Sequence, residues 1–140
     1  MRYLGLDLGT KTLGIAVSDR SNTLSSPLKI LRFQSEDYNS TIDELKKIIE
    51  EYKITNIALG LPKNMDGSLG FAANRSLEYK KLLEENFNME IALIDERLTS
   101  VSAHNILSNN GKKTINHKDK VDAVAASLIL ESYIKREENK

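Results

Sequence analysis

An acidic side chain inside an apolar, glycine-flanked run near the start of the chain most constrains what this sequence can fold into. Residues 3–8 have the composition of a buried strand, yet Asp7 lies between leucines within it. An ionised carboxylate is costly to bury unless it is paired or bound to a metal. Asp7 therefore either belongs to a functional site or is a strand-end aspartate that accepts hydrogen bonds from backbone amides.

Two later segments place acids in similarly apolar surroundings. Asp95 and Glu96 follow the apolar run 91–94, and Asp122 lies among the valines and alanines of 121–126. Carboxylates about 4 Å apart repel by roughly 1 kcal/mol in water and by about 4 kcal/mol at an effective dielectric of 20. Such groups converge only around a counter-charge, and oxygen ligands suit Mg²⁺ or Mn²⁺. We therefore predict a site for one or two divalent ions.

The ligands expected for this site are Asp7, Asp122 and one of the two adjacent acids. Neighbouring residues of an extended chain point to opposite faces, so we favour Glu96 as the ligand and expect Asp95 to pair with Arg97 or the backbone. Asp122 has an alternative role, because a negative charge near a helix N-terminus is favoured by the helix dipole.

Several cationic and hydroxyl side chains are candidates for substrate contact. Thr10 and Lys11 lie in a predicted tight turn after the first strand, where backbone amides and a lysine can meet phosphate. Lys63 and Arg75 flank a glycine-containing loop, and Arg97 could hold a phosphate through two hydrogen bonds. Each also has an ordinary structural reading as a turn residue or a surface charge.

Hydrophobic periodicity predicts an α/β chain with a mixed five-stranded sheet and helices on both faces. Short separations favour an antiparallel meander for the first three strands. The expected strands are 3–8, 12–18, 24–33 (irregular or at an edge), 54–59 and 90–94; the expected helices are about 42–52, 71–87, 100–107 and 119–135. We expect one domain over 1–140, with a mobile loop at about 108–118.

Local signals suggest how two of these helices begin and pack. Ser40 or Thr41 offers an N-cap for the helix at 42–52. In the helix at 71–87, Leu77, Leu82 and Leu83 are expected to face inward.

Composition narrows the functional class. The chain has no cysteine, 20 basic and 20 acidic residues, and a formal net charge of zero. No apolar run approaches the roughly 18 residues of a membrane span, and the first residues do not resemble a signal peptide. We expect a cytoplasmic protein with no membrane partner. A non-specific nucleic-acid coat would normally be more basic.

Four motifs in order resemble the YqgF (RuvX-like) family. They are residues 6–19 (LDLGTKTLGIAVSD), 60–67 (GLPKNMDG), 95–100 (DERLTS) and 120–126 (KVDAVAA). The resemblance covers nearly the whole chain. It implies a ribonuclease H-like fold and a metal-dependent phosphodiester hydrolase whose acids are Asp7, Glu96 and Asp122. The chain departs from other ribonuclease H-like nucleases at 60–62, where Gly-Leu-Pro replaces the acid that ends the fourth strand.

The expected function is a divalent-metal-dependent endonuclease for structured RNA. The resemblance implies processing of the 5′ end of pre-16S ribosomal RNA, with the protein a monomer or weak homodimer. One alternative is a Holliday junction resolvase acting on branched DNA, which would need a dimer for two symmetric cuts. A second alternative is a non-catalytic RNA-binding module, which the neutral net charge favours. A nucleotide-binding module is also an alternative, since Asp-x-Gly-Thr resembles the phosphate-binding hairpin of sugar kinases.

Overall fold

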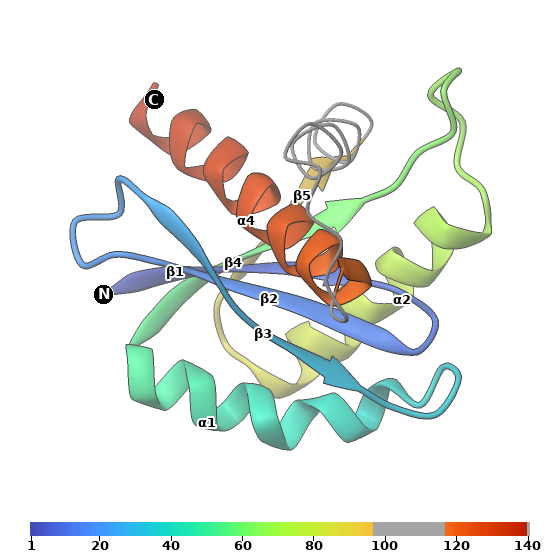
Figure 1. Cartoon of the computed structure of the whole chain (residues 1–140), viewed down its shortest axis with the longest axis horizontal. Coiled ribbons are helices and arrows are strands. Elements are labelled where there is room, and N and C mark those ends of the chain that lie inside the picture. The colour runs from blue at the N-terminus through green and yellow to red at the C-terminus, as the bar shows by residue number, and fades with distance from the viewer. Residues whose placement is uncertain (97–116, 140) are drawn as a thin grey trace.

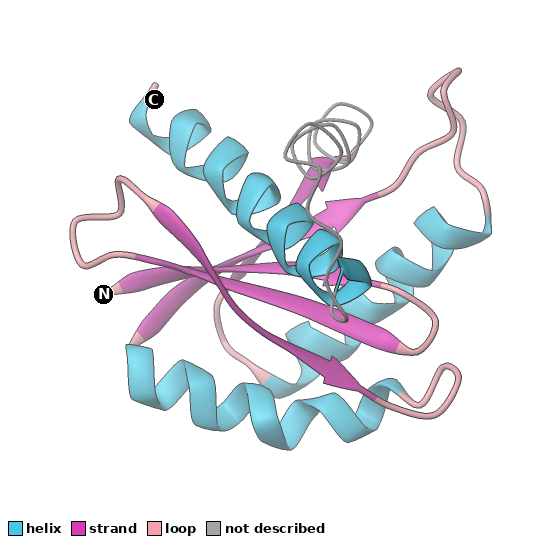
Figure 2. Ribbon diagram, viewed as in Figure 1, coloured by secondary structure: helices cyan, strands magenta, loops and turns pink. Residues whose placement is uncertain are grey.

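The computed structural model describes residues 1–96 and 117–139, the latter with side chains from residue 124 onward. In these residues a mixed sheet is flanked by helices on both faces (Figures 1 and 2). The elements are β1 (Arg2–Leu8), β2 (Thr12–Ser18), β3 (Ser25–Arg32), the 3₁₀ helix η1 (Tyr38–Thr41), α1 (Ile42–Tyr52), β4 (Ile54–Leu61), α2 (Phe71–Asn86), β5 (Glu90–Asp95) and α4 (His117–Glu138).

The sheet has the strand order β3-β2-β1-β4-β5. The pairs β1–β2 and β2–β3 are antiparallel, which confirms the predicted meander, and β1–β4 and β4–β5 are parallel. β3 is an edge strand, as its Pro27 predicts. Because β1, β4 and β5 run in the same direction, their carboxyl ends meet at one border of the sheet, which we call the carboxyl edge.

Alternation along β1 divides the core into two layers. Leu4, Leu6 and Leu8 lie in the apolar layer formed with α1 and α2. Tyr3 and Gly5 face α4 on the other side, where a Cβ at Gly5 would lie 2.7 Å from the Ala126 carbonyl oxygen. α4 therefore packs directly on the backbone of β1, and Asp7 continues the α4-facing set.

The layer under α1 and α2 differs from the prediction in two details. No side chain caps α1: η1 precedes it, and the Thr41 hydroxyl donates to the Tyr38 carbonyl at 2.7 Å and meets the Tyr79 hydroxyl at 2.7 Å. In α2 the buried side chains include Tyr79 and Leu83, whereas Leu77 and Leu82 are half-buried. Because the Tyr79 hydroxyl has a hydrogen-bond partner in Thr41, the whole Tyr79 side chain can be buried there.

α4 extends beyond both predicted ends, and it crosses the face of the sheet (Figure 1). Its buried side chains are Ala125, Ala126, Ile129, Leu130, Tyr133 and Ile134. The predicted helix at 100–107 and most of the predicted loop at 108–118 lie outside the described residues; residues 117 and 118 belong to α4. Across the described ranges, no helix is long and apolar enough to span a bilayer.

Candidate active site

Asp7 occupies the carboxyl end of β1 among residues with small side chains. It pairs with Gly14 of β2, while Gly5, two residues earlier on the same face, pairs with Ala16. The residues beside Asp7 on this face of the hairpin are glycine and alanine. None of these neighbours therefore places a bulky side chain beside Asp7 on the face covered by α4.

Glu96 reaches the same place from β5. Its backbone N–H donates to the Leu61 carbonyl at 3.2 Å, and the residue is only 5% exposed. A Cβ built on Gly60 would lie 2.6 Å from Cδ and 2.7 Å from Oε2 of Glu96. The glycine at the end of β4 therefore leaves the space that the Glu96 carboxyl group fills.

The helix closes this space from the other side. The same Cβ on Gly60 would lie 2.6 Å from Cδ1 of Ile129. Glu96 is consequently enclosed between the sheet and α4, which accounts for its low exposure. The departure from other ribonuclease H-like nucleases at 60–62 has a physical reason here, because an acid at Gly60 would compete with Glu96 for this volume.

The two carboxyl groups affect each other strongly. Burial raises the pKa of Glu96 well above its ordinary value of 4.5, and the charge of Asp7, a hydrogen bond with Asp7 and the charge of Asp95 raise it further. In the protein without metal, Glu96 is therefore protonated at neutral pH and shares its proton with Asp7. Such an arrangement is costly for folding alone and is relieved by a cation.

The donor set fits a hard divalent ion, because both groups offer carboxylate oxygens. Within the described side chains, no group of three or more histidine, aspartate or glutamate residues is arranged to hold a metal. Asp122, the third predicted ligand, lies on α4, but its side chain is outside the described set.

Two segments with predicted substrate-binding residues border this pair. Thr10 and Lys11 are exposed in the turn between β1 and β2, and their carbonyls accept hydrogen bonds from Glu36 and Phe33, both at 2.9 Å. The Lys63 N–H donates at 3.1 Å to the Leu61 carbonyl that also accepts from Glu96. The turn and the start of the β4–α2 loop are therefore at the carboxyl edge.

The remaining predicted residues lie elsewhere. Arg75 is on α2, on the face of the sheet opposite α4, where its charge partly offsets the rise that burial causes in the pKa of Tyr38. Arg97 is outside the described residues.

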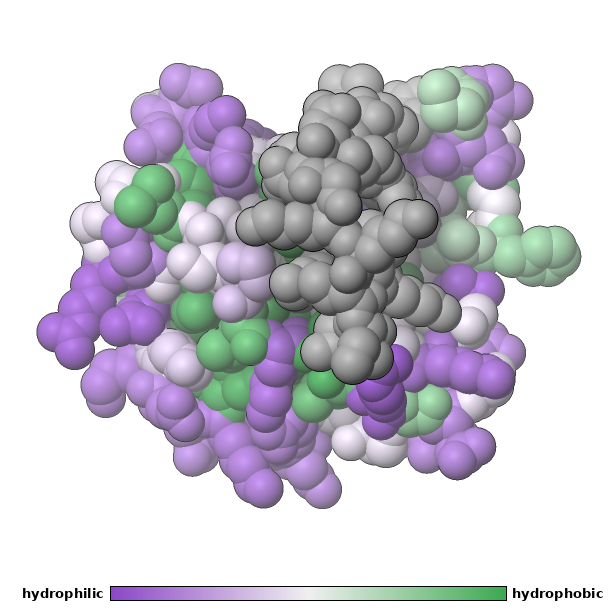
Figure 3. Space-filling view, in the orientation of Figure 1, coloured by the Kyte–Doolittle hydropathy of each residue, from purple (hydrophilic) through white to green (hydrophobic). Residues whose placement is uncertain are grey.

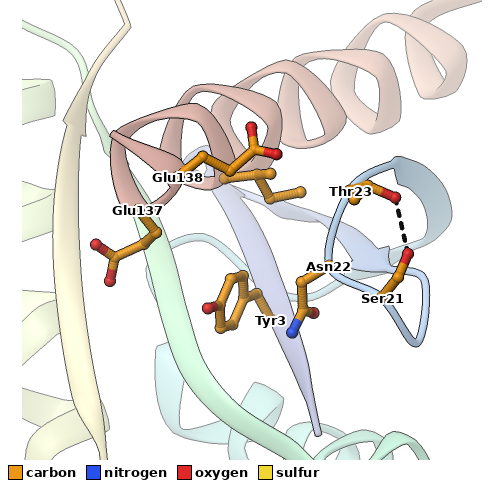
Figure 4. Close-up of a pocket in the computed structure, with 7 residues that line it drawn as sticks. Tyr3, Ser21, Asn22, Thr23, Glu137 and Glu138 are labelled. Atoms are coloured by element: carbon orange, nitrogen blue, oxygen red, sulfur yellow. Dashed lines mark hydrogen bonds between the residues drawn. The ribbon is translucent and has the colours of Figure 1, made fainter. Parts of the chain in front are cut away.

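A separate recess of about 230 Å³ lies at the other end of the sheet, beside the end of α4 (Figure 4). Its lining includes Tyr3, Asn22, Glu137 and Glu138, and no lysine or arginine is among its described lining residues. Two carboxylates without a cation disfavour phosphate. The carboxyl edge is the better place for a nucleic-acid substrate.

Sequence reasoning missed the parts played by Gly60 and Ile129. Gly60 was noted as part of a motif and as the position of a missing acid, but not for the space it leaves. A signal was available, since a strand-interior glycine often marks a close approach by another group. Nothing in the local pattern around Ile129 relates it to Glu96, because that contact depends on how α4 lies on the sheet.

The sequence model of the RuvX family, described as Holliday junction resolvase, matches residues 1–136. A protein of Lactobacillus acidophilus is 40% identical over 136 residues, covering 96% of each chain. One of Clostridium botulinum (strain Hall) is 41% identical over 134 residues, again covering 96% of each. Both are named "Putative pre-16S rRNA nuclease".

Solved structures show a more distant likeness. The T. thermophilus RuvC in complex with a Holliday junction substrate is 12% identical, with a TM-score of 0.64 over 100% of this chain and 97% of that one. The fowlpox virus Holliday junction resolvase is 18% identical, with a TM-score of 0.55 over 97% and 99%. These likenesses confirm the ribonuclease H-like fold.

Proposed function

Since the chain belongs to the RuvX family, we propose that it is a divalent-metal-dependent endonuclease for structured RNA. Its relatives named as nucleases indicate a hydrolase that acts on ester bonds. Its substrate is the precursor of 16S ribosomal RNA, at the 5′ end. The observation that carries this proposal is the meeting of Asp7 and Glu96 over Gly60.

The pair is better explained by function than by folding. A buried acid held beside another acid opposes folding, and hydrophobic side chains of similar size would pack there without that cost. Mg²⁺ or Mn²⁺ would be held by Asp7 and Glu96, and it would supply activation of water and stabilisation of the leaving oxygen.

The backbone register of α4 supports Asp122 as the third ligand. The rings of Tyr133 and Tyr3 are 5.1 Å apart between centroids, and Gly5 packs against Ala126 and Leu130. Moving toward the start of α4 thus means moving toward the carboxyl end of β1. Four residues of helix, from 126 back to Asp122, span about 6 Å. Two strand residues, from Gly5 to Asp7, span a similar length. Because Gly5 packs against Ala126, the backbone at Asp122 should therefore lie near Asp7.

The chain's own residues divide the remaining tasks. Lys63, Thr10 and Lys11 border the acid pair from two loops and hold the phosphates on either side of the scissile bond. Asp7 and Glu96 would hold the ion, which would supply positive charge for the reacting phosphate. Enclosure under Ile129 limits water around Glu96, which strengthens each of these interactions.

RNA is favoured over DNA by the names of the relatives at 40–41% identity. Branched DNA remains the second candidate substrate, because the matching family model carries the description Holliday junction resolvase.

Cleavage assays with purified protein test both. Wild-type protein should cut a pre-16S RNA fragment in Mg²⁺ or Mn²⁺ and not in EDTA, and Asp7→Asn should abolish cutting while its circular dichroism and melting temperature show a folded protein. A four-way DNA junction is assayed in parallel. Cutting of the junction alone would replace the RNA assignment, and equal cutting by a folded Asp7→Asn would refute the metal-dependent mechanism.

A further inference from the structure

Three large apolar side chains are exposed where the chain passes from β4 to α2: two lie in the connection, and the third, Phe71, is the first residue of α2. The exposed fractions are 82% for Met65, 48% for Leu69 and 91% for Phe71. We call these three residues the apolar loop. Among the described residues, the other highly exposed large hydrophobic side chains are Met1 and Leu24, which lie at the opposite edge of the sheet.

The apolar loop has a defined conformation. The Asn64 N–H donates to the Ser68 carbonyl at 2.9 Å, and the Gly67 N–H donates to the Asn64 carbonyl at 2.8 Å. Asp66 accepts from the N–H and the hydroxyl of Ser68 at 2.9 and 2.6 Å. Gly67 has a φ of 88°, which favours glycine. This turn holds Met65 at its tip, so the exposure is built into the loop.

The loop begins next to the acid pair. The Leu61 carbonyl accepts from both Glu96 and Lys63, so the connection leaves the sheet beside Glu96. The connection projects from the molecule (Figure 1), and pale green, moderately hydrophobic atoms protrude on that side of the space-filling view (Figure 3).

We propose that the apolar loop binds an unpaired base of the RNA substrate, with Phe71 stacking on the base and Lys63 near the adjoining phosphate. This inference rests on the proposed function and adds to it a preference for single-stranded nucleotides beside the cleavage site. Stacking on an aromatic ring is available to every base, whatever the sequence.

A protein partner is the less suitable occupant. A stable protein interface buries about 800 Å² on each side, and three side chains on one loop provide too little surface. Lys63 and the neighbouring acid pair instead suit a phosphate chain that continues into the active site.

Binding is measured by fluorescence with two RNAs in Ca²⁺: a duplex with a single-stranded overhang containing 2-aminopurine, and the same duplex with blunt ends. The variants are Phe71→Ala, Phe71→Leu and Phe71→Trp. The matched control is Leu24→Ala, which removes an apolar side chain that is 68% exposed at the far edge. Because Phe71 is exposed, its variants should keep the wild-type melting temperature.

We expect Phe71→Ala to weaken binding of the overhang RNA by about 5- to 150-fold and to remove the 2-aminopurine quenching. Phe71→Trp should retain both properties, Phe71→Leu should not, and Leu24→Ala should match wild type. Binding of the blunt duplex should change little.

Unchanged overhang binding by Phe71→Ala, or an equal loss on both RNAs, overturns the inference while leaving the nuclease proposal intact. A dimer in sedimentation that Phe71→Ala dissociates would assign the loop to a second copy of the chain and also overturns it. If wild-type protein binds neither RNA, the RNA assignment itself fails.

Discussion

The substitution Gly60→Ala tests the space that Glu96 occupies. The added Cβ would lie 2.6 Å from Cδ of Glu96 and 2.6 Å from Cδ1 of Ile129. Ordinary carbon contacts are about 3.5–4.0 Å, so each neighbour must retreat by roughly 1 Å. Overpacking of this kind costs about 1–3 kcal/mol, and the stiffer unfolded chain offsets about 0.4–1 kcal/mol of it.

The net loss of about 1–2 kcal/mol corresponds to a fall in melting temperature of roughly 4–8 °C for a domain of this size. The effect on cleavage should be larger. A displacement of about 1 Å in a catalytic group can cost 100-fold in rate, and the variant should show a loss of this order at saturating Mg²⁺. Calorimetry and single-turnover cleavage of the same preparation measure the two effects.

A companion variant separates the two contacts. Ile129→Val removes the Cδ1 atom that meets the new Cβ, so Gly60→Ala should cost less stability in an Ile129→Val background. Cleavage should stay low, because the clash with Glu96 remains. Wild-type melting and cleavage in Gly60→Ala would refute the packing described for Glu96, and recovery of cleavage in the double variant would assign the loss to α4 instead.

Three further predictions concern the acid pair, the helix contact and a surface turn. Without metal, folded protein binds more protons than unfolded protein above the ordinary pKa of Glu96 (4.5), so its stability should fall as pH rises from there. In EDTA at pH 8, Glu96→Gln should therefore melt above wild type, and a lower melting temperature would contradict this. In Mg²⁺, the same variant should not cleave. Gly5→Ala places a Cβ 2.7 Å from the Ala126 carbonyl oxygen and 2.7 Å from Leu130 Cβ. Because helix backbone moves less readily than the ends of side chains, denaturant unfolding should show a loss of about 2–3 kcal/mol in the free energy of unfolding. A loss smaller than that of Gly60→Ala would contradict this. Hydrogen bonds from the Thr23 and Leu24 amides lower the pKa of Asp19 below 3.8. The stabilisation that ionised Asp19 provides is present above pH 3.8 and is lost as pH falls through the native pKa. The melting-temperature gap between wild type and Asp19→Asn should therefore close as pH falls below 3.8, and a gap independent of pH would argue against it.

The sequence was most informative where structure depends on neighbouring residues. Hydrophobic periodicity predicted both strands of the β1–β2 hairpin and their antiparallel order, which places Gly14 opposite Asp7. Glu96 could be favoured over Asp95 only by strand alternation. The structure adds that Glu96 is enclosed and affected by Asp7.

Features that depend on distant contacts were missed or misplaced. β4 and β5 extend past their predicted ends because Gly60 and Leu61 pair with Ile94 and Asp95. Thr41 occupies the predicted N-cap position of α1, but its side chain makes no capping hydrogen bond, because its hydroxyl bonds to the Tyr38 carbonyl and to Tyr79, 38 residues later. The enclosure of Glu96 likewise depends on α4.

Anomalous diffraction from crystals grown with Mn²⁺ tests the central claim most directly. The account predicts a peak within about 2.5 Å of carboxyl oxygens of both Asp7 and Glu96, with Asp122 approaching from α4. Well-ordered Asp7 and Glu96 with Mn²⁺ bound only elsewhere would contradict it.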